Sequence, residues 1–317
     1  MIHTSRTVLV TGGAGFIGSH VCEAFRDEGW RVIALDDLSS GRRENVPEDV
    51  EFVELDIRSD DLGRLMKKRR VELVNHHAAQ IDVRVSVSRP RHDASINVDG
   101  WLNVLQSAHE AGAARVLYVS SGGVVYGEPD QIPTGERAPK APISPYGVSK
   151  LAGEHYMFFY RRVHGLEGVA LRYSNVYGPR QNPHGEAGVV ALFAKRLLEG
   201  ENLRIFGDGE QTRDYVYVGD VAAANLAAAG LPATEPASID DVAFNVATGS
   251  ETSVVQLADA LLGVSGAAVR KEFAPARPGE LERSCLDVSK FEARGWAPRV
   301  ELAEGLRRTY EHIAENL

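Results

Sequence analysis

The sequence predicts an α/β protein built on a doubly wound parallel sheet, with a smaller mixed α/β lobe that holds the substrate. Short apolar strands alternate with amphipathic helices through the first half of the chain, as in a parallel sheet covered by helices. A glycine-rich loop follows the first strand and opens the first helix, and Asp36 ends the second strand. Together these features predict a Rossmann-type sheet.

The strands of this sheet are expected where short apolar runs end at polar residues. They span residues 7–10, 31–35, 52–55, 73–75, 115–120 and 169–173. Helices are expected from the glycine loop to about residue 28, over 60–69 and over about 96–111. Pro142 and Pro145 interrupt the chain and open a further helix, because proline is tolerated only at a helix start.

Composition and charge limit the function classes. The 317 residues are 44% hydrophobic, which suffices for a large core and two domains or lobes. The formal net charge of −9 provides no general attraction to nucleic acid or an anionic membrane. We expect no signal peptide and no membrane span, because no apolar run is long enough. Two distant cysteines, Cys22 and Cys285, indicate a reducing compartment, so we expect a cytoplasmic protein.

The loop after the first strand predicts a dinucleotide cofactor. Its glycines follow a G-x-x-G-x-x-G spacing at Gly12, Gly15 and Gly18. They allow a tight turn and let a pyrophosphate approach the N-terminus of the following helix. Asp36 would accept hydrogen bonds from the adenosine ribose and repel a 2′-phosphate. The sequence therefore predicts NAD rather than NADP, against which only the nearby Arg42 and Arg43 argue.

Tyr146 and Lys150 form the candidate catalytic pair. Residues at i and i+4 share one face of a helix. A phenol is a poor base because its usual pKa is about 10, and a cation beside it favours the phenolate. The pair is therefore predicted to accept a proton from a hydroxyl group. A packed tyrosine beside a solvated lysine would explain an isolated Y-x-x-x-K, but the preceding NAD loop favours catalysis.

We predict a division of the chain after residue 177, where Gly178-Pro179 and Asn182-Pro183 mark loops. Residues 1–177 would form the NAD-binding domain. Residues 178–317 would form the smaller substrate lobe, with some of the chain crossing back to the first domain.

These motifs, in this order, resemble the extended short-chain dehydrogenase/reductase family, and within it the nucleotide-sugar 4-epimerases. The resemblance covers essentially the whole chain and includes the segments 56–57, 77–80, 120–121, 171–180, 184–190, 213–216 and 277–280. It implies a UDP-sugar 4-epimerase that interconverts UDP-glucose and UDP-galactose by transient oxidation at C4 with bound NAD.

The resemblance also implies roles for individual residues. The catalytic residues would be Tyr146, Lys150 and Ser121. The residues that contact NAD would be Gly12, Gly15, Phe16, Ile17, Gly18, Asp36, Asp56, Ile57, Ala78, Gln80, Asn97, Tyr146 and Lys150. The UDP-sugar would be held by Ser121, Tyr146, Asn175, Val189, Phe206, Arg213 and Arg277. Arginines bind a diphosphate through charge-assisted hydrogen bonds, although ion pairs with Asp214 or Glu280 would also explain the two arginines. No metal is expected.

The chain departs from the family pattern at Gly122, where many members carry a hydroxyl residue that orients the 4-hydroxyl. We expect Ser121 or a water to replace it. Gly122 and Gly123 also stand where the dehydratases of the family carry an acidic pair, which argues against 4,6-dehydration. Ser284 occupies the position that limits the size of the C2 substituent, so its small side chain implies that UDP-GlcNAc and UDP-GalNAc are accepted as well.

The sequence also gives expectations for binding partners and leaves alternative functions open. The partner is a UDP-sugar, with no nucleic acid and no membrane. The resemblance implies a homodimer formed by the helix that carries Tyr146 and the helix near 96–111. One alternative is a UDP-glucuronate 4-epimerase or another NAD-dependent nucleotide-sugar-modifying enzyme, such as a decarboxylase. An alternative of a different class is a non-catalytic NAD-binding regulator.

Overall fold

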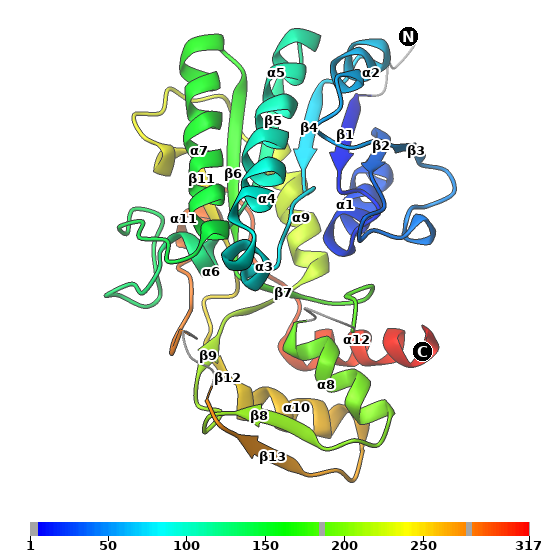
Figure 1. The fold of residues 1–317 in the computed structure, drawn as a ribbon, viewed down its shortest axis with the longest axis vertical. Coiled ribbons are helices and arrows are strands. Elements are labelled where there is room, and N and C mark those ends of the chain that lie inside the picture. The colour runs from blue at the N-terminus through cyan, green and yellow to red at the C-terminus, as the bar shows by residue number, and fades with distance from the viewer. Residues whose placement is uncertain (1–5, 184–187, 277–280, 317) are drawn as a thin grey trace.

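A seven-stranded parallel sheet forms the centre of the computed structural model, which describes residues 6–183, 188–276 and 281–316. Its strands are β1 (Thr7–Thr11), β2 (Arg31–Asp36), β3 (Glu51–Glu54), β4 (Leu73–His76), β5 (Arg115–Ser121), β6 (Glu167–Tyr173) and β11 (Ala243–Val246). They lie in the order β11-β6-β5-β4-β1-β2-β3, and every pairing is parallel (Figure 1). Apart from β11, this is the strand order of a dinucleotide-binding sheet, so the predicted fold class is confirmed.

Helices cover both faces of the sheet. One face carries α1 (Phe16–Asp27), α9 (Val218–Ala229) and the short α11 (Ser289–Glu292), and the other carries α2 (Asp61–Arg69), α5 (Trp101–Ala111) and α7 (Pro145–His164). Strand β1 shows how the two cores divide, because Val8 and Val10 join the first and Leu9 joins the second. Coverage on both sides explains why the strands are continuous apolar runs.

The strand order reverses between β1 and β4, which is where ligands bind at the carboxyl ends of such sheets. The loops that follow these two strands touch at this point. Gly12 has a positive φ of 67°, and a Cβ on it would lie only 2.7 Å from the backbone nitrogen of Ala78. Glycine is therefore required at position 12 both by the turn and by the close approach of the second loop.

The helical segment after β4 is longer than the predicted 96–111. It begins with α3 (Val83–Ser88) and continues through α4 (Pro90–Ala94) and a π-helical turn, η2 (Ser95–Gly100), into α5. Pro90 opens α4 at its first position, where the missing N–H costs no hydrogen bond. The π turn includes the predicted cofactor residue Asn97, and such turns often occur at functional sites.

The smaller lobe lies beyond the carboxyl ends of the large sheet (Figure 1). It contains α8 (Val189–Leu198), α10 (Val254–Ser265) and α12 (Leu302–Asn316), which pack around an apolar core with β8. Its short strands form three pairs: β7 (Asn175–Tyr177) with β10 (Tyr215–Tyr217), β8 (Leu203–Phe206) with β13 (Lys271–Ala274), and β9 (Thr212–Arg213) with β12 (Thr252–Ser253). A capping box of Ser253 and Gln256 starts α10.

The chain returns from this lobe to the large sheet. Strand β11 pairs with β6 at the sheet edge, and α9 packs against α1. Phe291 and Trp296 join the same core. The division at residue 177 stays a prediction, since residues from both sides of it build one core. The remaining short elements are η1 (Arg43–Asn45), α6 (Gly122–Val125) and η3 (Ile239–Asp241). Within the described ranges, no helix is both long and apolar enough to cross a membrane.

Candidate active site

Helix α7 brings Tyr146 and Lys150 to the end of β5. The helix starts where the Ser144 hydroxyl accepts a hydrogen bond from the backbone N–H of Gly147 (3.1 Å). The Lys150 ammonium donates to the carbonyl of Val119 on β5 (2.9 Å) and lies 5.7 Å from the centre of the Tyr146 ring. The structure therefore places the two predicted catalytic side chains together, with the lysine buried and the tyrosine partly exposed.

Burial dominates the electrostatics of this pair. It lowers the pKa of Lys150 to about 8, while the nearby carboxylate of Asp93 acts in the opposite direction. Burial also raises the pKa of Tyr146 above its usual value, and Asp93 adds to that rise. The predicted lowering of the Tyr146 pKa is wrong for the chain by itself, because burial and Asp93 both raise it.

The end of β5 holds the predicted site residue Ser121 and its neighbour Ser120 in different ways. The Ser120 hydroxyl donates to a carboxylate oxygen of Glu154 on α7 (2.5 Å), so it serves the packing of the helix. Ser121 follows at the start of α6 and is partly exposed. A Cβ on Gly122 would lie 2.4 Å from Cδ1 of Leu286. The place of the family's usual hydroxyl residue is thus filled by Leu286, which the sequence analysis missed.

Gln80 and Asn97 hydrogen-bond to each other and to a carboxylate that sequence reasoning also missed. The Gln80 backbone N–H donates to Asn97 Oδ1 (3.0 Å), and Asn97 Nδ2 donates to the Gln80 carbonyl (2.8 Å) and to Asp93 Oδ1 (2.9 Å). Gln80 Nε2 also donates to Asp93 Oδ1 (3.1 Å). The side-chain amides of the two predicted cofactor residues therefore already have protein partners. Their contact with NAD stays a prediction.

The residues predicted to hold the UDP portion come from separate elements of the smaller lobe. Asn175 is exposed at the start of β7, Val189 begins α8, and Phe206 ends β8 beneath the Arg204 guanidinium. Arg213 lies on β9 and donates to the carbonyl of Thr212 (2.7 Å). Arg277 lies outside the described residues.

The alternative explanation for Arg213 was an ion pair with Asp214. The Asp214 side chain is buried, and its carboxylate accepts hydrogen bonds from the backbone N–H groups of Thr248 (2.8 Å) and Gly249 (3.0 Å). Burial raises the pKa of Asp214, against the effect of these donors. Asp214 thus fixes the turn after β11 and does not engage the Arg213 guanidinium.

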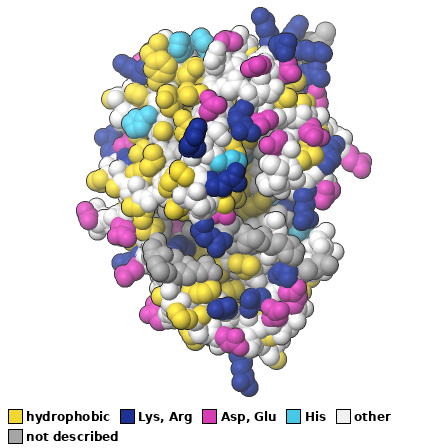
Figure 2. Space-filling model, in the orientation of Figure 1, with side chains coloured by type: hydrophobic (Ala, Val, Ile, Leu, Met, Phe, Trp, Pro, Cys, Tyr) yellow, Lys and Arg dark blue, Asp and Glu magenta, His cyan; other side chains and the backbone are white. Residues whose placement is uncertain are grey.

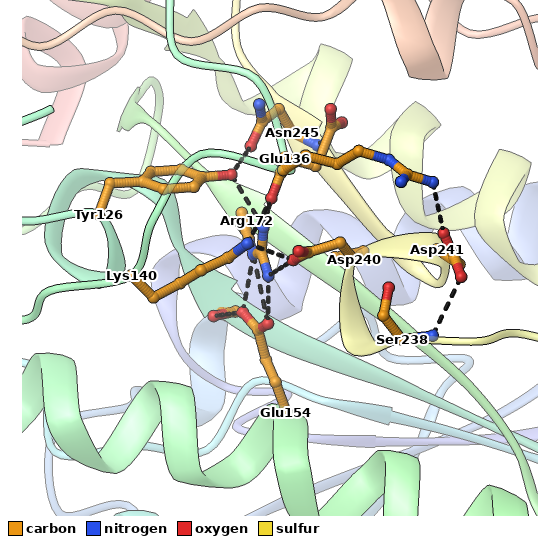
Figure 3. A network of polar contacts seen from close by, with 12 residues as sticks. Tyr126, Glu136, Lys140, Glu154, Arg172, Ser238, Asp240, Asp241 and Asn245 are labelled. Carbon is orange, nitrogen blue, oxygen red and sulfur yellow. Dashed lines mark hydrogen bonds and ion pairs between the residues drawn. The ribbon is translucent and has the colours of Figure 1, made fainter. Parts of the chain in front are cut away.

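A buried polar network packs against helix α7, which carries Tyr146 and Lys150 (Figure 3). The Arg172 guanidinium on β6 binds Glu154 of α7 through two nitrogens, with Nη2 at 2.6 Å from the carboxylate, and both side chains are fully buried. Its other donors reach the Tyr126 hydroxyl (3.0 Å), the Glu136 carbonyl (2.8 Å) and Asp240 (2.9 Å). Arg172 thereby joins β6, α7, η3 and the segment before α7.

The histidines near the site are not arranged as metal ligands. His76 stacks on Trp101 (centroids 4.6 Å apart) and accepts or donates a hydrogen bond with Thr11 (2.8 Å). Burial lowers the pKa of His77 to about 3, so this ring is neutral at physiological pH. Among the described residues, no group of three or more His, Cys, Asp or Glu side chains could hold a metal ion.

Several of the residues predicted to contact NAD already have partners within the protein. Asp36 is buried, and its carboxylate accepts from the backbone N–H groups of Ala14 (3.0 Å) and Leu38 (2.9 Å). Burial raises its pKa. Asp56 forms an ion pair with Arg58 (2.5 Å), and Ile57 belongs to the core against α5. These contacts leave their predicted roles in NAD binding untested.

The glycine loop after β1 leads into an N-terminus of α1 that has no side-chain cap. Gly15 is the N-cap of α1 and makes no side-chain cap, so among the described residues no capping side chain occupies the first turn, which includes Phe16 and Ile17. A Cβ on Gly18 would lie 2.1 Å from the Gly12 carbonyl oxygen, so helix and loop pack at a distance that only glycine permits. Free backbone donors at a helix N-terminus suit an anionic phosphate group.

The comparison with protein families agrees with this geometry. The model of the NAD dependent epimerase/dehydratase family matches residues 8–247, which is most of the chain. The chain belongs to this family. Its membership accounts for the glycine loop and the strand order, which are features of dinucleotide-binding folds.

Similar proteins from the NAD dependent epimerase/dehydratase family match from end to end. UDP-glucose 4-epimerase from Mycolicibacterium smegmatis is 47% identical over 309 residues, covering 96% of this chain and 97% of that protein. The crystal structure of UDP-glucose 4-epimerase with UDP-glucose from Thermotoga maritima has a TM-score of 0.93 and 43% identity, covering 98% and 99% of the two chains. The crystal structure of the Thermus thermophilus UDP-glucose 4-epimerase in complex with NAD has a TM-score of 0.90 and 44% identity, covering 98% and 100%.

The residues present fit the cofactor of the NAD dependent epimerase/dehydratase family. The first turn of α1 offers backbone N–H groups to a pyrophosphate, and Asp36 stands at the end of β2 where the fold places the ribose. These two points and the Tyr146–Lys150 pair lie at the carboxyl ends of β1, β2 and β5, on one edge of the large sheet.

Proposed function

We propose that this protein is a UDP-sugar 4-epimerase that interconverts UDP-glucose and UDP-galactose. The observation that carries the proposal is the position of Tyr146 and Lys150, side by side at the end of β5 and on the same sheet edge as the dinucleotide loop. Relatives with this named activity match the chain over nearly its full length, which supports the same substrate class.

In the proposed reaction, the residues of the chain move one proton and hold the sugar. NAD, when bound, takes up a hydride from C4 of the sugar and returns it to the opposite face of that carbon. Tyr146 accepts the proton of the 4-hydroxyl as the hydride leaves and gives it back as the hydride returns, so the whole reaction is redox-neutral. The Lys150 ammonium, beside the Tyr146 ring, favours the phenolate, and burial acts in the opposite direction. Ser121 hydrogen-bonds the 4-oxygen, because Leu286 fills the space beside Gly122.

The sugar must turn between the two half-reactions, so the nucleotide must be anchored firmly and the sugar loosely. We assign the UDP anchor to Asn175, Val189, Phe206, Arg213 and Arg277. The first four come from separate elements, which would hold the uridine and diphosphate from several sides and leave the sugar free on the side of Tyr146.

The same segment that touches the catalytic strand also carries the proposed specificity residue. Ser284 is 9% exposed and its backbone N–H donates to the Thr212 carbonyl (3.2 Å). It stands two positions before Leu286 in the segment that leads into α11. We assign to Ser284 the limit on the C2 substituent, which leaves room for an N-acetyl group.

A homodimer belongs to this proposal. Exposed apolar side chains recur along one face of α7 at Val148, Tyr156, Phe159 and Val163. Hydrophobic side chains gather over this region in Figure 2. A second copy would cover them. Light scattering should report twice the chain mass, and Phe159→Glu should shift it to the monomer; a monomeric parent protein would refute the dimer.

The two cysteines indicate the cellular compartment in which the protein works. Cys22 and Cys285 are both buried and unpaired with each other, which agrees with a reducing environment, and we propose the cytoplasm.

The decisive experiment offers the purified protein UDP-galactose without added NAD and follows the formation of UDP-glucose. Parallel reactions with UDP-GalNAc and with UDP-glucuronate test the wider range and the rival epimerase. Tyr146→Phe serves as the matched control, because it removes only the proton-accepting oxygen. If UDP-galactose and UDP-glucose are not interconverted even after the protein has been loaded with NAD, the proposal is refuted. Turnover of UDP-glucuronate alone would favour a UDP-glucuronate 4-epimerase.

A non-catalytic NAD-binding regulator is the second candidate of a different class. It would bind NAD but convert none of these sugars, and Tyr146→Phe would leave its activity in the cell unchanged. The burial of Lys150 beside Tyr146 favours the enzyme, because a buried ammonium with a lowered pKa is typical of catalytic sites and has no use in a regulator that only binds NAD.

A further inference from the structure

Asp93 is a fully buried carboxylate next to the proposed active site. It lies on α4, and its Oδ1 accepts hydrogen bonds from Asn97 (2.9 Å) and Gln80 (3.1 Å). Its Oδ2 accepts a hydrogen bond from the hydroxyl of Ser149 (2.6 Å). All three partners are neutral, so hydrogen bonds solvate the carboxylate but none of them balances its charge.

The segment that carries Asp93 connects the two halves of the site. Ser149 stands between Tyr146 and Lys150 on α7, so its bond to Asp93 fixes this turn of the helix. Earlier in the same segment, the Ser86 hydroxyl accepts a hydrogen bond from the backbone N–H of Tyr146 (3.2 Å). Through Gln80, Asp93 also holds the loop that follows β4. The catalytic helix and the cofactor-side loop are therefore tied to one carboxylate.

The other ionisable groups around Lys150 do not replace this charge. At the end of β4, burial keeps His76 and the following His77 neutral, because it lowers the pKa of both. From β5, Tyr118 faces the ammonium with its ring centre at 5.3 Å, and burial raises its pKa. On α7 itself, Glu154 is neutralised by Arg172, and Tyr146 is the proposed base. Asp93 is thus the uncompensated anion that faces the pair among the described residues.

We propose that Asp93 is a positioning residue whose buried negative charge sets the pH range in which Tyr146 and Lys150 work together. This rests on the proposed epimerase function. Asp93 fixes the geometry through Ser149 and Gln80, and its charge acts on both members of the pair. It raises the pKa of Lys150, against the larger effect of burial, and it raises the pKa of Tyr146 in addition to burial.

Asp93→Asn removes the charge and can keep every hydrogen bond. The new amide oxygen can accept from Asn97 and Gln80, and the new NH2 group can donate to the Ser149 hydroxyl, which both donates and accepts. Without the anion, phenolate forms at lower pH and the ammonium is lost at lower pH. Both limbs of the pH profile of kcat/KM should move to lower pH, by about half a unit or more.

Two control variants separate charge from geometry. Asp93→Glu keeps the charge but displaces it. Both limbs of the kcat/KM profile should therefore stay at the same pH, while the maximum value of kcat/KM falls. Ser149→Ala removes one hydrogen bond and no charge, so its limbs should also stay in place. If Asp93→Asn cannot be purified, Asp93→Ser, which is also neutral, must show the same downward shift. If the limbs of the kcat/KM profile stay at the same pH or move to higher pH in the neutral variant, the proposal is overturned.

A second readout is independent of turnover. The ultraviolet titration of Tyr146 is obtained as the difference between the NAD-loaded protein and its Tyr146→Phe variant, with and without Asp93→Asn. The phenolate should appear at lower pH when Asp93 is neutral, and an unshifted titration would refute the role of Asp93. This measurement holds even if the protein fails to convert UDP-galactose, so failure of the proposed function and failure of this inference are distinguishable.

Discussion

Leu286 occupies the space that a side chain on Gly122 would need, with its Cδ1 2.4 Å from the position of a Cβ there. The two residues come from distant parts of the sequence, and their contact closes the catalytic strand end against the segment that carries Ser284. The departure of this chain from its family's hydroxyl residue is therefore matched by a compensating residue opposite.

This contact predicts that restoring the family's hydroxyl residue damages the protein. Gly122→Ser should lower the free energy of unfolding by about 1–3 kcal/mol, because an overpacked core must shift its neighbours. Urea unfolding measures the loss. Adding Leu286→Ala should recover part of it by opening space, and a Gly122→Ser protein as stable as the parent would contradict the reason given.

Removing the proton acceptor should abolish most of the activity. Tyr146→Phe should lower kcat for UDP-galactose by about two to four orders of magnitude, the usual contribution of a general base. The ring remains, so packing and unfolding temperature should be unchanged. Steady-state kinetics on the NAD-loaded protein measures the effect, and a loss smaller than tenfold would assign the proton to another group.

Substitution at Ser284 should separate the two pairs of sugars. Ser284→Tyr should suppress conversion of UDP-GlcNAc and UDP-GalNAc and spare the pair without the N-acetyl group, because the bulky ring takes the space of that group. Ser284→Ala is the matched control and should retain both activities. Competition assays measure kcat/KM for the N-acetylated pair of sugars and for the plain pair. An equal loss for both pairs would refute the role assigned to Ser284.

Removing only one partner of the buried ion pair between Arg172 and Glu154 should lower the stability of the protein strongly. Arg172→Leu leaves Glu154 charged and fully buried, so stability should fall by about 3–5 kcal/mol. Removing both charges together, with Glu154→Leu added, should recover much of this loss. Arg307→Leu, at an exposed pair with Glu311, is the control and should change unfolding little. Equal losses at both pairs would contradict the role of burial.

Acid should destabilise the protein partly through His77. Burial lowers its pKa from 6.5 to about 3, so between these values the unfolded chain binds a proton that the folded chain does not. The contribution of His77 is complete above pH 6.5 and falls by about 1.4 kcal/mol per unit as the pH drops below it. Unfolding in urea across this range should show a shallower slope for His77→Gln, and identical slopes would mean that the ring titrates normally when folded.

The features that could be predicted from the sequence are those set by local pattern. The glycine loop, the end of β2 at Asp36, and the i, i+4 relation of Tyr146 and Lys150 are each read within a short stretch of chain. What was missed depends on packing between distant segments. Leu286 against Gly122 has no local signal, and Asp93 stands out only once α4 is seen to touch α7.

The pKa of Tyr146 could not be predicted for the same reason. Its direction depends on how much water the fold removes from the phenol, and the sequence shows the neighbouring cation but not that loss of hydration. The predicted helix over 96–111 began too late because apolar periodicity does not identify a π turn or a helix start at Pro90.

Strand β11 has a consequence for the order in which the chain can fold as it is made. It is the seventh strand of the large sheet, yet it is synthesised only after much of the smaller lobe. Until residue 246 has left the ribosome, β6 has a bare edge, with backbone N–H and C=O groups ready to pair with any other strand. A truncated chain that stops at residue 177 would keep that edge, and would lack α9 over α1 as well. Such a fragment is expected to aggregate rather than stand alone as a nucleotide-binding unit.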